Sequence, residues 1–331
     1  MLSEPTNTVS IKIERCPVCY SENRQFLFYT YDVQFSKTLK EFPLVKCLNC
    51  DVAYLKERPA KEIIGSYYPP NSYHSFTRKT GMERLLKRRF KIKIKDILKK
   101  RDQEMIDKIL SNYVPAYWRL AAQFPEGSKI LDIGCGGGWK LDLYKEFGWK
   151  TYGFDISSEA VEIAKSKGHK VLMAEVDNIS FPENYFDAIQ ISHVIEHLPD
   201  PVYTLKKAFK LLKEGGVLLL ETPNISSLLA KVFKADYWQI DSPRHFQVFN
   251  IKSLNILLKD CGFIIDSLRT NNSRNGIINS VRAIKTRKQG NSIDIQNSKF
   301  IKIINTILMI FLTPFNKFGF GENIIVFAKK S

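Results

Sequence analysis

The segment "HVIEH", residues 193–197, carries two histidines four residues apart with a glutamate between them. On a helix this spacing places both imidazoles on one face, and imidazole and carboxylate groups are common ligands of divalent metal ions. A catalytic metal site needs three protein ligands, and the neighbouring sequence suggests no third one. Whether this segment binds a metal therefore depends on the element that precedes it.

Four cysteines form two Cys-x-x-Cys pairs, "CPVC" (16–19) and "CLNC" (47–50). Each pair can place two thiolates on one tetrahedral ion, so two pairs complete a closed four-sulfur site. Disulfides or uncommitted thiols are the alternative, and the N-terminus lacks the apolar core of a secretion signal that disulfides would suggest. We predict a small zinc-ribbon-like unit with a structural zinc held by Cys16, Cys19, Cys47 and Cys50.

Strands and helices alternate from residue 128 onward. Strands are expected at 129–133, 150–157, 170–176, 185–192 and 216–224, with a closing strand within 318–330. This order predicts an α/β fold with a doubly wound, mostly parallel sheet. Ligands of such sheets bind beyond the carboxyl ends of the strands, and "HVIEH" begins where the fourth strand ends.

The first of these strands runs into the glycine-rich turn "DIGCGGGW", residues 132–139. A nicotinamide-dinucleotide fold needs a third small residue at the position that Trp139 occupies, so that cofactor is disfavoured. Two acids mark the ends of neighbouring strands, Asp132 before the turn and Asp155 after the second strand.

Four further segments follow in order: "AEVDNISFPENYFDAI", "HVIEHLPDP", "LKEGGVLLLETPN" and "GFGENIIVFAKK". With the glycine turn, they make residues from about 111 to 331 resemble the Rossmann-like, class I S-adenosylmethionine-dependent methyltransferases. The resemblance implies a seven-stranded sheet whose last strand is antiparallel, and S-adenosylmethionine as cofactor. Glycines let the backbone approach this cofactor, and acids suit its ammonium group and ribose hydroxyls.

The same resemblance implies the role of each cofactor residue. Asp132 would lie near the methionine end, Asp155 would hold the ribose hydroxyls, and Glu175 with Val176 would contact the adenine. The full implied set is Asp132, Gly134, Gly136, Gly138, Asp155, Ile156, Glu175, Val176 and His193. Because "HVIEH" matches a segment that many of these enzymes carry without a metal, the zinc-protease interpretation of His-x-x-Glu-His is disfavoured, and packing of His193 and His197 is favoured over catalysis.

The segment "DYWQIDSPRHFQVFN" (236–250) follows the fifth strand, where this class builds its acceptor pocket. His245 is the candidate general base for methyl transfer to a hydroxyl, because imidazole titrates near neutral pH. Fixing the loop is the alternative role for His245. In "SYYPP", Tyr67 or Tyr68 would either cover the cofactor or pack in the interior.

The cysteine pairs followed by this domain resemble bacterial enzymes of surface-polysaccharide and secondary-metabolite pathways. The resemblance implies O-methylation of a sugar, a polysaccharide precursor or a related metabolite by direct displacement at the methyl carbon. The alternative function is RNA methylation at a ribose or ring nitrogen. Enzymes that methylate exocyclic amines carry an Asn/Asp-Pro-Pro-aromatic motif where this chain has "SHVIEH", so a small-molecule or glycan acceptor is favoured over nucleic acid.

Positive charge is concentrated in one segment of a chain whose net charge is +16. Residues 84–101, "RLLKRRFKIKIKDILKKR", hold ten Lys or Arg against one acid, with apolar residues at helical spacing. This predicts a basic amphipathic helix, and three partners stay open: an anionic membrane surface or lipid-linked substrate, nucleic acid, or solvent alone. The sequence does not decide the oligomeric state.

The predicted domains are a zinc-ribbon-like unit (1–57), a helical linker or lid with the basic helix (58–127) and the S-adenosylmethionine-binding domain (128–331). The longest apolar run, "IINTILMIFLTPF" (303–315), is shorter than the ~20 residues that a membrane span needs. We therefore expect a cytoplasmic protein, with peripheral contact at the inner face of the membrane as the role the basic helix would allow.

Overall fold

The computed structural model describes residues 10–32, 34–35, 40–68, 115–273, 275–289, 305–308 and 311–331. The chain divides into two compact units made of interleaved segments. The first unit takes its residues from 1–72, 193–209 and 220–328, and the second from 73–192, 210–219 and 329–331. The predicted basic helix (84–101) and most of the predicted linker (58–127) lie outside the described residues, and the predicted domain boundaries stay predictions.

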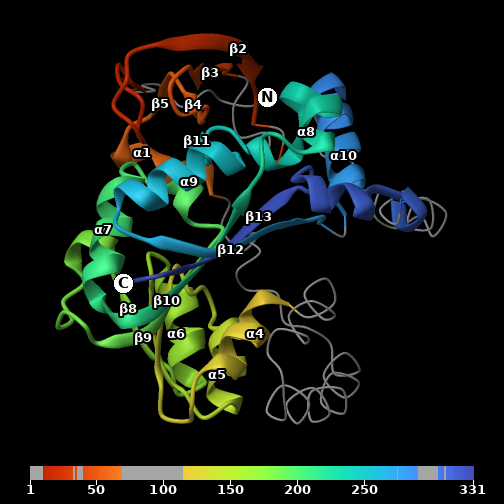
Figure 1. Cartoon of the computed structure of the whole chain (residues 1–331). Coiled ribbons are helices and arrows are strands. Elements are labelled where there is room, and N and C mark those ends of the chain that lie inside the picture. The colour runs from red at the N-terminus through yellow and green to blue at the C-terminus, as the bar shows by residue number, and fades with distance from the viewer. Residues whose placement is uncertain are drawn as a thin grey trace. The chain divides into compact units, whose positions relative to one another are not determined.

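The second unit contains the start of the predicted alternation of strands and helices. Its elements are α4 (Ala116–Gln123), β6 (Lys129–Ile133), α5 (Trp139–Glu146), β7 (Lys150–Asp155), α6 (Ser158–Ser166), β8 (Lys170–Met173) and β9 (Phe186–Ser192). Strand β6 pairs in parallel with β7 and β9, and β7 pairs in parallel with β8. Helices α5 and α6 contact β7 and β8 (Figure 1).

Helix α6 illustrates how the sequence specifies these elements. The Ser157 side chain caps the helix by accepting a hydrogen bond from the Ala160 N–H at 3.3 Å. Ala160, Val161 and Ala164 are buried on one face, which is the stripe that a surface helix turns toward a sheet.

Seven strands form the main sheet in the order β12-β13-β10-β9-β6-β7-β8. The additional strands are β10 (Leu212–Pro223), β12 (Ile264–Asn271) and β13 (Asn323–Lys329). This confirms the predicted Rossmann-like, mostly parallel seven-stranded sheet with an antiparallel last strand. The interiors of β6, β9 and β13 are mostly buried, as expected for inner strands of a sheet covered on both faces, whereas the two edge strands β12 and β8 are partly exposed.

The predicted bounds of three strands differ from the structure. Strands β7 and β8 end at Asp155 and Met173, before the predicted 157 and 176. The strand predicted at 216–224 begins earlier, at Leu212, because helix α7 (Pro201–Leu211), capped by Asp200 through a 2.8 Å hydrogen bond from the Tyr203 N–H, ends there. Gly215, at φ +72°, donates its N–H to the Lys330 carbonyl, so this glycine belongs to a strand and does not end a helix.

The cysteine-bearing segment forms a four-stranded sheet in the first unit, in the order β11-β4-β3-β2. Its strands are β2 (Arg24–Thr30), β3 (Phe42–Cys47), β4 (Ala53–Leu55) and β11 (Gln247–Val248). Strand β11 pairs antiparallel with β4, Gln247 opposite Tyr54 and Val248 opposite Ala53. This sheet therefore takes one edge strand, β11, from a segment about 190 residues later in the sequence, shortly after His245.

The remaining named strands are short, β1 (Ser10–Lys12) and its partner β5 (Glu57–Pro59). Further α-helices are α1 (Lys61–Ile64), α8 (Leu228–Phe233), α9 (Ile251–Asp260) and α10 (Gly276–Gln289), and short 3₁₀ helices lie between these elements. No helix within the described ranges has the length and apolar character required to cross a membrane.

Candidate functional site

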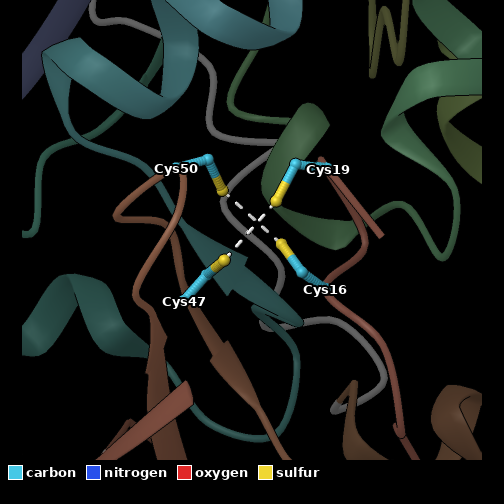
Figure 2. A group of neighbouring side chains, drawn as sticks. All are labelled: Cys16, Cys19, Cys47 and Cys50. Atoms are coloured by element: carbon cyan, nitrogen blue, oxygen red, sulfur yellow. Dashed lines mark hydrogen bonds between the residues drawn. The ribbon is translucent and has the colours of Figure 1, made fainter. Parts of the chain in front are cut away.

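The four cysteines of the two Cys-x-x-Cys pairs lie close together in the first unit (Figure 2). All four sulfur atoms lie within 4.8 Å of one another, with Cys16 and Cys50 at 3.5 Å and Cys19 and Cys47 at 3.5 Å. Tetrahedral zinc with Zn–S bonds of about 2.3 Å requires sulfur atoms about 3.8 Å apart. A hydrogen bond from Cys50 lowers the pKa of the Cys16 thiol to about 5. The cluster therefore has the chemistry and spacing to hold one metal ion.

The turns that contain the two Cys-x-x-Cys pairs share two backbone features. In the first, the Tyr20 N–H donates to the Cys16 carbonyl at 3.0 Å, and in the second the Asp51 N–H donates to the Cys47 carbonyl at 3.0 Å. Tyr20 and Asp51 both adopt positive φ, at +58° and +66°. Two equivalent turns that each present two thiols to the same point are what a closed tetrahedral site needs.

In the second unit, the glycine turn is held by Asp155. One carboxylate oxygen of Asp155 accepts a hydrogen bond from the Gly136 N–H at 2.8 Å, and the other accepts from the Ser157 N–H at 2.9 Å. Gly138 has φ +73°, and a Cβ there would lie 2.9 Å from the His169 ring and 3.1 Å from Ala164. Glycine is required here both by conformation and by the close approach of helix α6.

Asp132 lies at the carboxyl end of β6, almost fully buried. Burial raises the pKa of Asp132 to about 7, although the charge of Lys140 and the polar side chain of Gln190 lower it in part. The Lys140 ammonium also donates a hydrogen bond to the Ser192 hydroxyl. Lys140 was not predicted from the sequence. A lysine at the second position of the helix that follows the glycine turn could have indicated it.

The residues predicted to contact the adenine and the ribose lie at the ends of the neighbouring strands β7 and β8. Asp155 pairs with Met173 of β8, and the Ala174 N–H donates to the Asp155 carbonyl at 3.1 Å. Glu175 and Val176 come next, at the start of a 3₁₀ turn, and the Ile156 side chain is 71% exposed. The second unit thus contains all predicted cofactor residues except His193, which belongs to the first unit.

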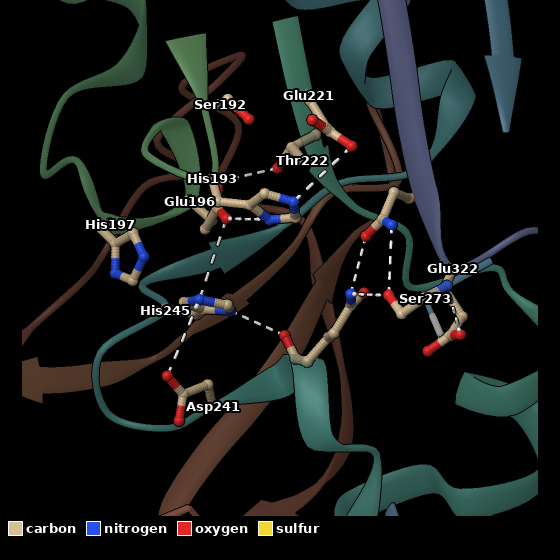
Figure 3. Close-up of polar contacts among 12 residues, drawn as sticks. Ser192, His193, Glu196, His197, Glu221, Thr222, Asp241, His245, Ser273 and Glu322 are labelled. Carbon is tan, nitrogen blue, oxygen red and sulfur yellow. Dashed lines mark hydrogen bonds and ion pairs between the residues drawn. The ribbon is translucent and has the colours of Figure 1, made fainter. Parts of the chain in front are cut away.

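A polar cluster surrounds Glu196 in the first unit (Figure 3). The Glu196 side chain is fully buried, and its Oε2 accepts a hydrogen bond from the Thr222 hydroxyl at 3.0 Å. Its Oε1 faces Nδ1 of His193 at 3.5 Å and Nε2 of His245 at 4.0 Å. Burial raises the pKa of Glu196, but the contact with His193 and the charges of the surrounding imidazoles together lower it to about 2.

The two histidines of "HVIEH" lie in different surroundings. His193 has φ +55°, and its ring is 43% exposed with Nε2 4.0 Å from Glu221. His197 is half-buried, with Nδ1 3.0 Å from the Arg244 carbonyl and 3.2 Å from the Tyr68 hydroxyl. Burial and the charge of His245 lower the pKa of His197 to about 4. The segment forms a 3₁₀ turn (Ile195–His197) rather than a helix, so its two imidazoles do not line up on one helical face.

His245 lies in the interior of the same cluster and is 8% exposed. Its Nδ1 is 2.8 Å from the Gln239 carbonyl, which can only accept, so Nδ1 carries the proton. Its Nε2 faces two carboxylates, Glu196 and Asp241, each at 4.0 Å. The role of His245 as a general base stays a prediction.

Arg244 is fully buried and binds two carboxylates. Its guanidinium donates to Asp241 through Nε at 3.0 Å and to Asp32 at 2.7 Å, with a further bond to the Tyr67 carbonyl at 3.1 Å. Tyr67 packs in the hydrophobic core of this unit, which is the packing alternative raised for it. Arg244 therefore ties the loop before β11 to the N-terminal segment.

The chain matches a family profile described as "Methyltransferase domain" over residues 99–268. It is 30% identical over 141 residues to a ubiquinone biosynthesis O-methyltransferase of Nitrosospira multiformis, covering 40% of this chain and 57% of that protein. It is 28% identical over 170 residues to a demethylmenaquinone methyltransferase of Geobacillus, covering 42% of this chain and 72% of that protein. The chain thus spans little more than half the length of the first of these relatives.

Among solved structures, a SAM-dependent methyltransferase from Archaeoglobus fulgidus matches with a TM-score of 0.45 and 23% identity, covering 75% of this chain and 99% of that one. The predicted methyltransferase class is confirmed by the family profile, which covers more than half of the chain. By that match, this protein belongs to the methyltransferase domain family.

Proposed function

We propose that this protein is an S-adenosylmethionine-dependent methyltransferase that transfers the methyl group to a hydroxyl oxygen of a small organic acceptor. The observation that carries the proposal is the glycine turn held by Asp155 beside the buried Asp132, within the segment that matches the family. When bound, the cofactor supplies a methyl group made electrophilic by a positively charged sulfur.

The residues fit this cofactor. Asp132 suits a cationic ammonium group, and the Asp155 carboxylate has lone pairs left for ribose hydroxyls after accepting two backbone N–H groups. The exposed apolar side chain of Ile156 suits the face of an adenine ring. Because acceptor and methyl must be aligned at close range, positioning accounts for much of the rate.

The acceptor class rests on two separate arguments. The order of cysteine pairs and methyltransferase domain supports a hydroxyl on a sugar, a polysaccharide precursor or a related metabolite. A phenolic hydroxyl of a quinone precursor is the second candidate, favoured by the 30% identity to a ubiquinone biosynthesis O-methyltransferase. A methylation assay on a panel of nucleotide sugars and catechol-type phenols separates the two, and RNA serves as the third substrate class.

Asp155→Ala should weaken S-adenosylmethionine binding about 100-fold, because two charge-assisted hydrogen bonds to the ribose are lost. Titration calorimetry with the cofactor and with its demethylated product measures the change. Asp187→Ala is the matched control, because Asp187 also accepts a backbone N–H, from Lys129 at 2.8 Å, but lies near the start of β9. Equal losses in both variants would contradict the assigned ribose role.

Cofactor affinity should increase as pH rises toward and through 7. The pKa of Asp132 is raised to about 7, so a large share of this carboxyl is protonated in the free protein below that pH. A cation bound beside Asp132 favours the ionised form, so binding releases protons. The number released approaches one per bound cofactor at low pH. Calorimetry in two buffers of different ionisation enthalpy counts the protons released.

The raised pKa of Asp132 also makes the free energy of unfolding depend on pH, in the opposite direction. The pKa of Asp132 is about 3.8 when unfolded and higher when folded, so the free protein loses stability as pH rises between these values. Asp132→Asn should remove both pH dependences, and proton release that persists in this variant would assign it to another group.

We also propose that the four cysteines hold a structural zinc ion. The equivalent turns and the sulfur spacing support it, and the four ligands leave no open position for catalysis.

A further inference from the structure

Three side chains of the first unit approach one another away from the four cysteines. They are Glu196, His197 and His245, and one carboxylate oxygen and one ring nitrogen of each imidazole lie within 4.8 Å of one another (Figure 3). Glu196 and His197 come from the 3₁₀ turn after β9, and His245 comes from the loop before β11. No third ligand is evident in the sequence beside "HVIEH", and the fold brings His245 there from 48 residues further along the chain.

The Glu196 carboxylate is only partly satisfied. Its Oε2 accepts a hydrogen bond from Thr222, but within the described parts of the chain its Oε1 has no hydrogen-bond donor, although the whole side chain is buried. A buried carboxylate oxygen without a donor is costly, so something cationic is expected at this point. The imidazoles of His193 and His245 lie 3.5 and 4.0 Å from Oε1.

His245 is oriented as metal-binding histidines usually are. Its Nδ1–H donates to the Gln239 backbone carbonyl, which fixes the tautomer and leaves the lone pair of Nε2 directed toward Glu196 and Asp241. Histidine ligands of metals commonly donate their second nitrogen to a backbone carbonyl in this way. His197 is held by the Arg244 carbonyl and the Tyr68 hydroxyl, which restrict its ring in the same manner.

The buried cation beside the cluster is engaged by two other carboxylates. The guanidinium of Arg244 forms ion pairs with Asp32 and Asp241. Buried carboxylates are stable when they are paired with a cation or coordinate a metal. The ring of His193 contacts the same carboxylate and is 43% exposed, so the cluster reaches the surface of this unit.

We propose that Glu196, His197 and His245 form a second metal site, which binds a divalent first-row transition-metal ion. Two imidazoles and one carboxylate are the donor set of mononuclear zinc, iron, manganese and cobalt sites. Three protein ligands leave a coordination position open for an external oxygen atom, unlike the closed four-cysteine site. Because metal–ligand bonds are about 2.0–2.2 Å long, the three side chains must close by about 1 Å on binding.

This site goes beyond the proposed methyltransferase function and does not depend on it, because metal binding is measured without turnover. It does exclude one prediction. A metal ion on Nε2 of His245 occupies the lone pair that a general base needs, so His245 serves as a ligand or as a base but not as both.

Titration of the zinc-loaded protein with Co²⁺ tests the site. We expect one cobalt ion per chain in addition to the zinc, with visible d–d absorption and without the near-ultraviolet thiolate charge-transfer band that cobalt in the cysteine site would give. Glu196→Gln and His245→Gln should each weaken this binding about 100-fold or more. His197→Gln should weaken it about tenfold or more, since its ring has other partners.

His193→Gln is the matched control, because this histidine contacts the same carboxylate but is not a proposed ligand, and cobalt affinity should change less than threefold. Circular dichroism shows whether each variant is folded. If a variant does not fold, the titration of the unmodified protein still decides. Absence of the d–d absorption at about 1 mM cobalt, or cobalt binding that the folded ligand variants leave unchanged, overturns the proposal.

Discussion

Arg244→Met is expected to lower the free energy of unfolding of the first unit by about 3–5 kcal/mol. Arg244 is completely buried and its guanidinium binds Asp32 and Asp241, which are buried as well. Substitution of the arginine removes a buried cation from both carboxylates, and an uncompensated buried charge costs more than the original ion pair contributes. Urea denaturation monitored by tryptophan fluorescence measures the change.

Arg287→Met supplies the comparison, since Arg287 also forms a two-pronged contact with an aspartate. Its Nε and Nη2 each lie 2.7 Å from a carboxylate oxygen of Asp236, but its side chain is 38% exposed. Exposed ion pairs contribute about 0–1 kcal/mol, so this variant should unfold close to the unmodified protein. Similar losses in both variants would show that burial does not set the cost, and Asp32→Asn combined with Arg244→Met should recover part of the stability.

The strands and cofactor turn of the second unit could be predicted from the sequence. Strand β6 was expected at 129–133 and runs Lys129–Ile133, and β9 was expected at 185–192 and runs Phe186–Ser192. These elements are readable because each is a short apolar run closed by glycine or by a polar residue. Local patterns of this kind depend on residues close in the chain, which is what periodicity reports.

The polar interior of the first unit could not be predicted in the same way. Arg244 and Asp32 are 212 residues apart in sequence, and Glu196 and His245 are 49 apart, so no spacing rule connects them. The pairing of β11 with β4 is equally non-local. The placement of "DYWQIDSPRHFQVFN" (236–250) beside an acceptor pocket stays a prediction, and the buried ion pair of its Arg244 could not be read from the segment. Only the fold brings such residues together.

Cys16→Ser is expected to remove the zinc ion and to unfold the β11-β4-β3-β2 sheet. Structural zinc contributes about 10–16 kcal/mol of apparent binding free energy at neutral pH, which is also folding free energy for a small unit. Elemental analysis should give one zinc per chain before the change and none after it. Hydrogen exchange should become fast in β3 and β4 while β6 and β9 of the second unit stay protected.

Because β11 pairs with β4, loss of the zinc should also raise exchange at Gln247 and Val248, far away in sequence. Cys261→Ser is the matched control, since this thiol is also buried in the first unit but lies outside the cluster, and it should keep the zinc and the protection.

Retention of the metal after Cys16→Ser would contradict the four-cysteine assignment. If Cys16→Ser retains one zinc per chain, the metal is bound elsewhere, and Glu196→Gln in the same background should then release it. If neither change releases the metal, both proposed metal sites are wrong.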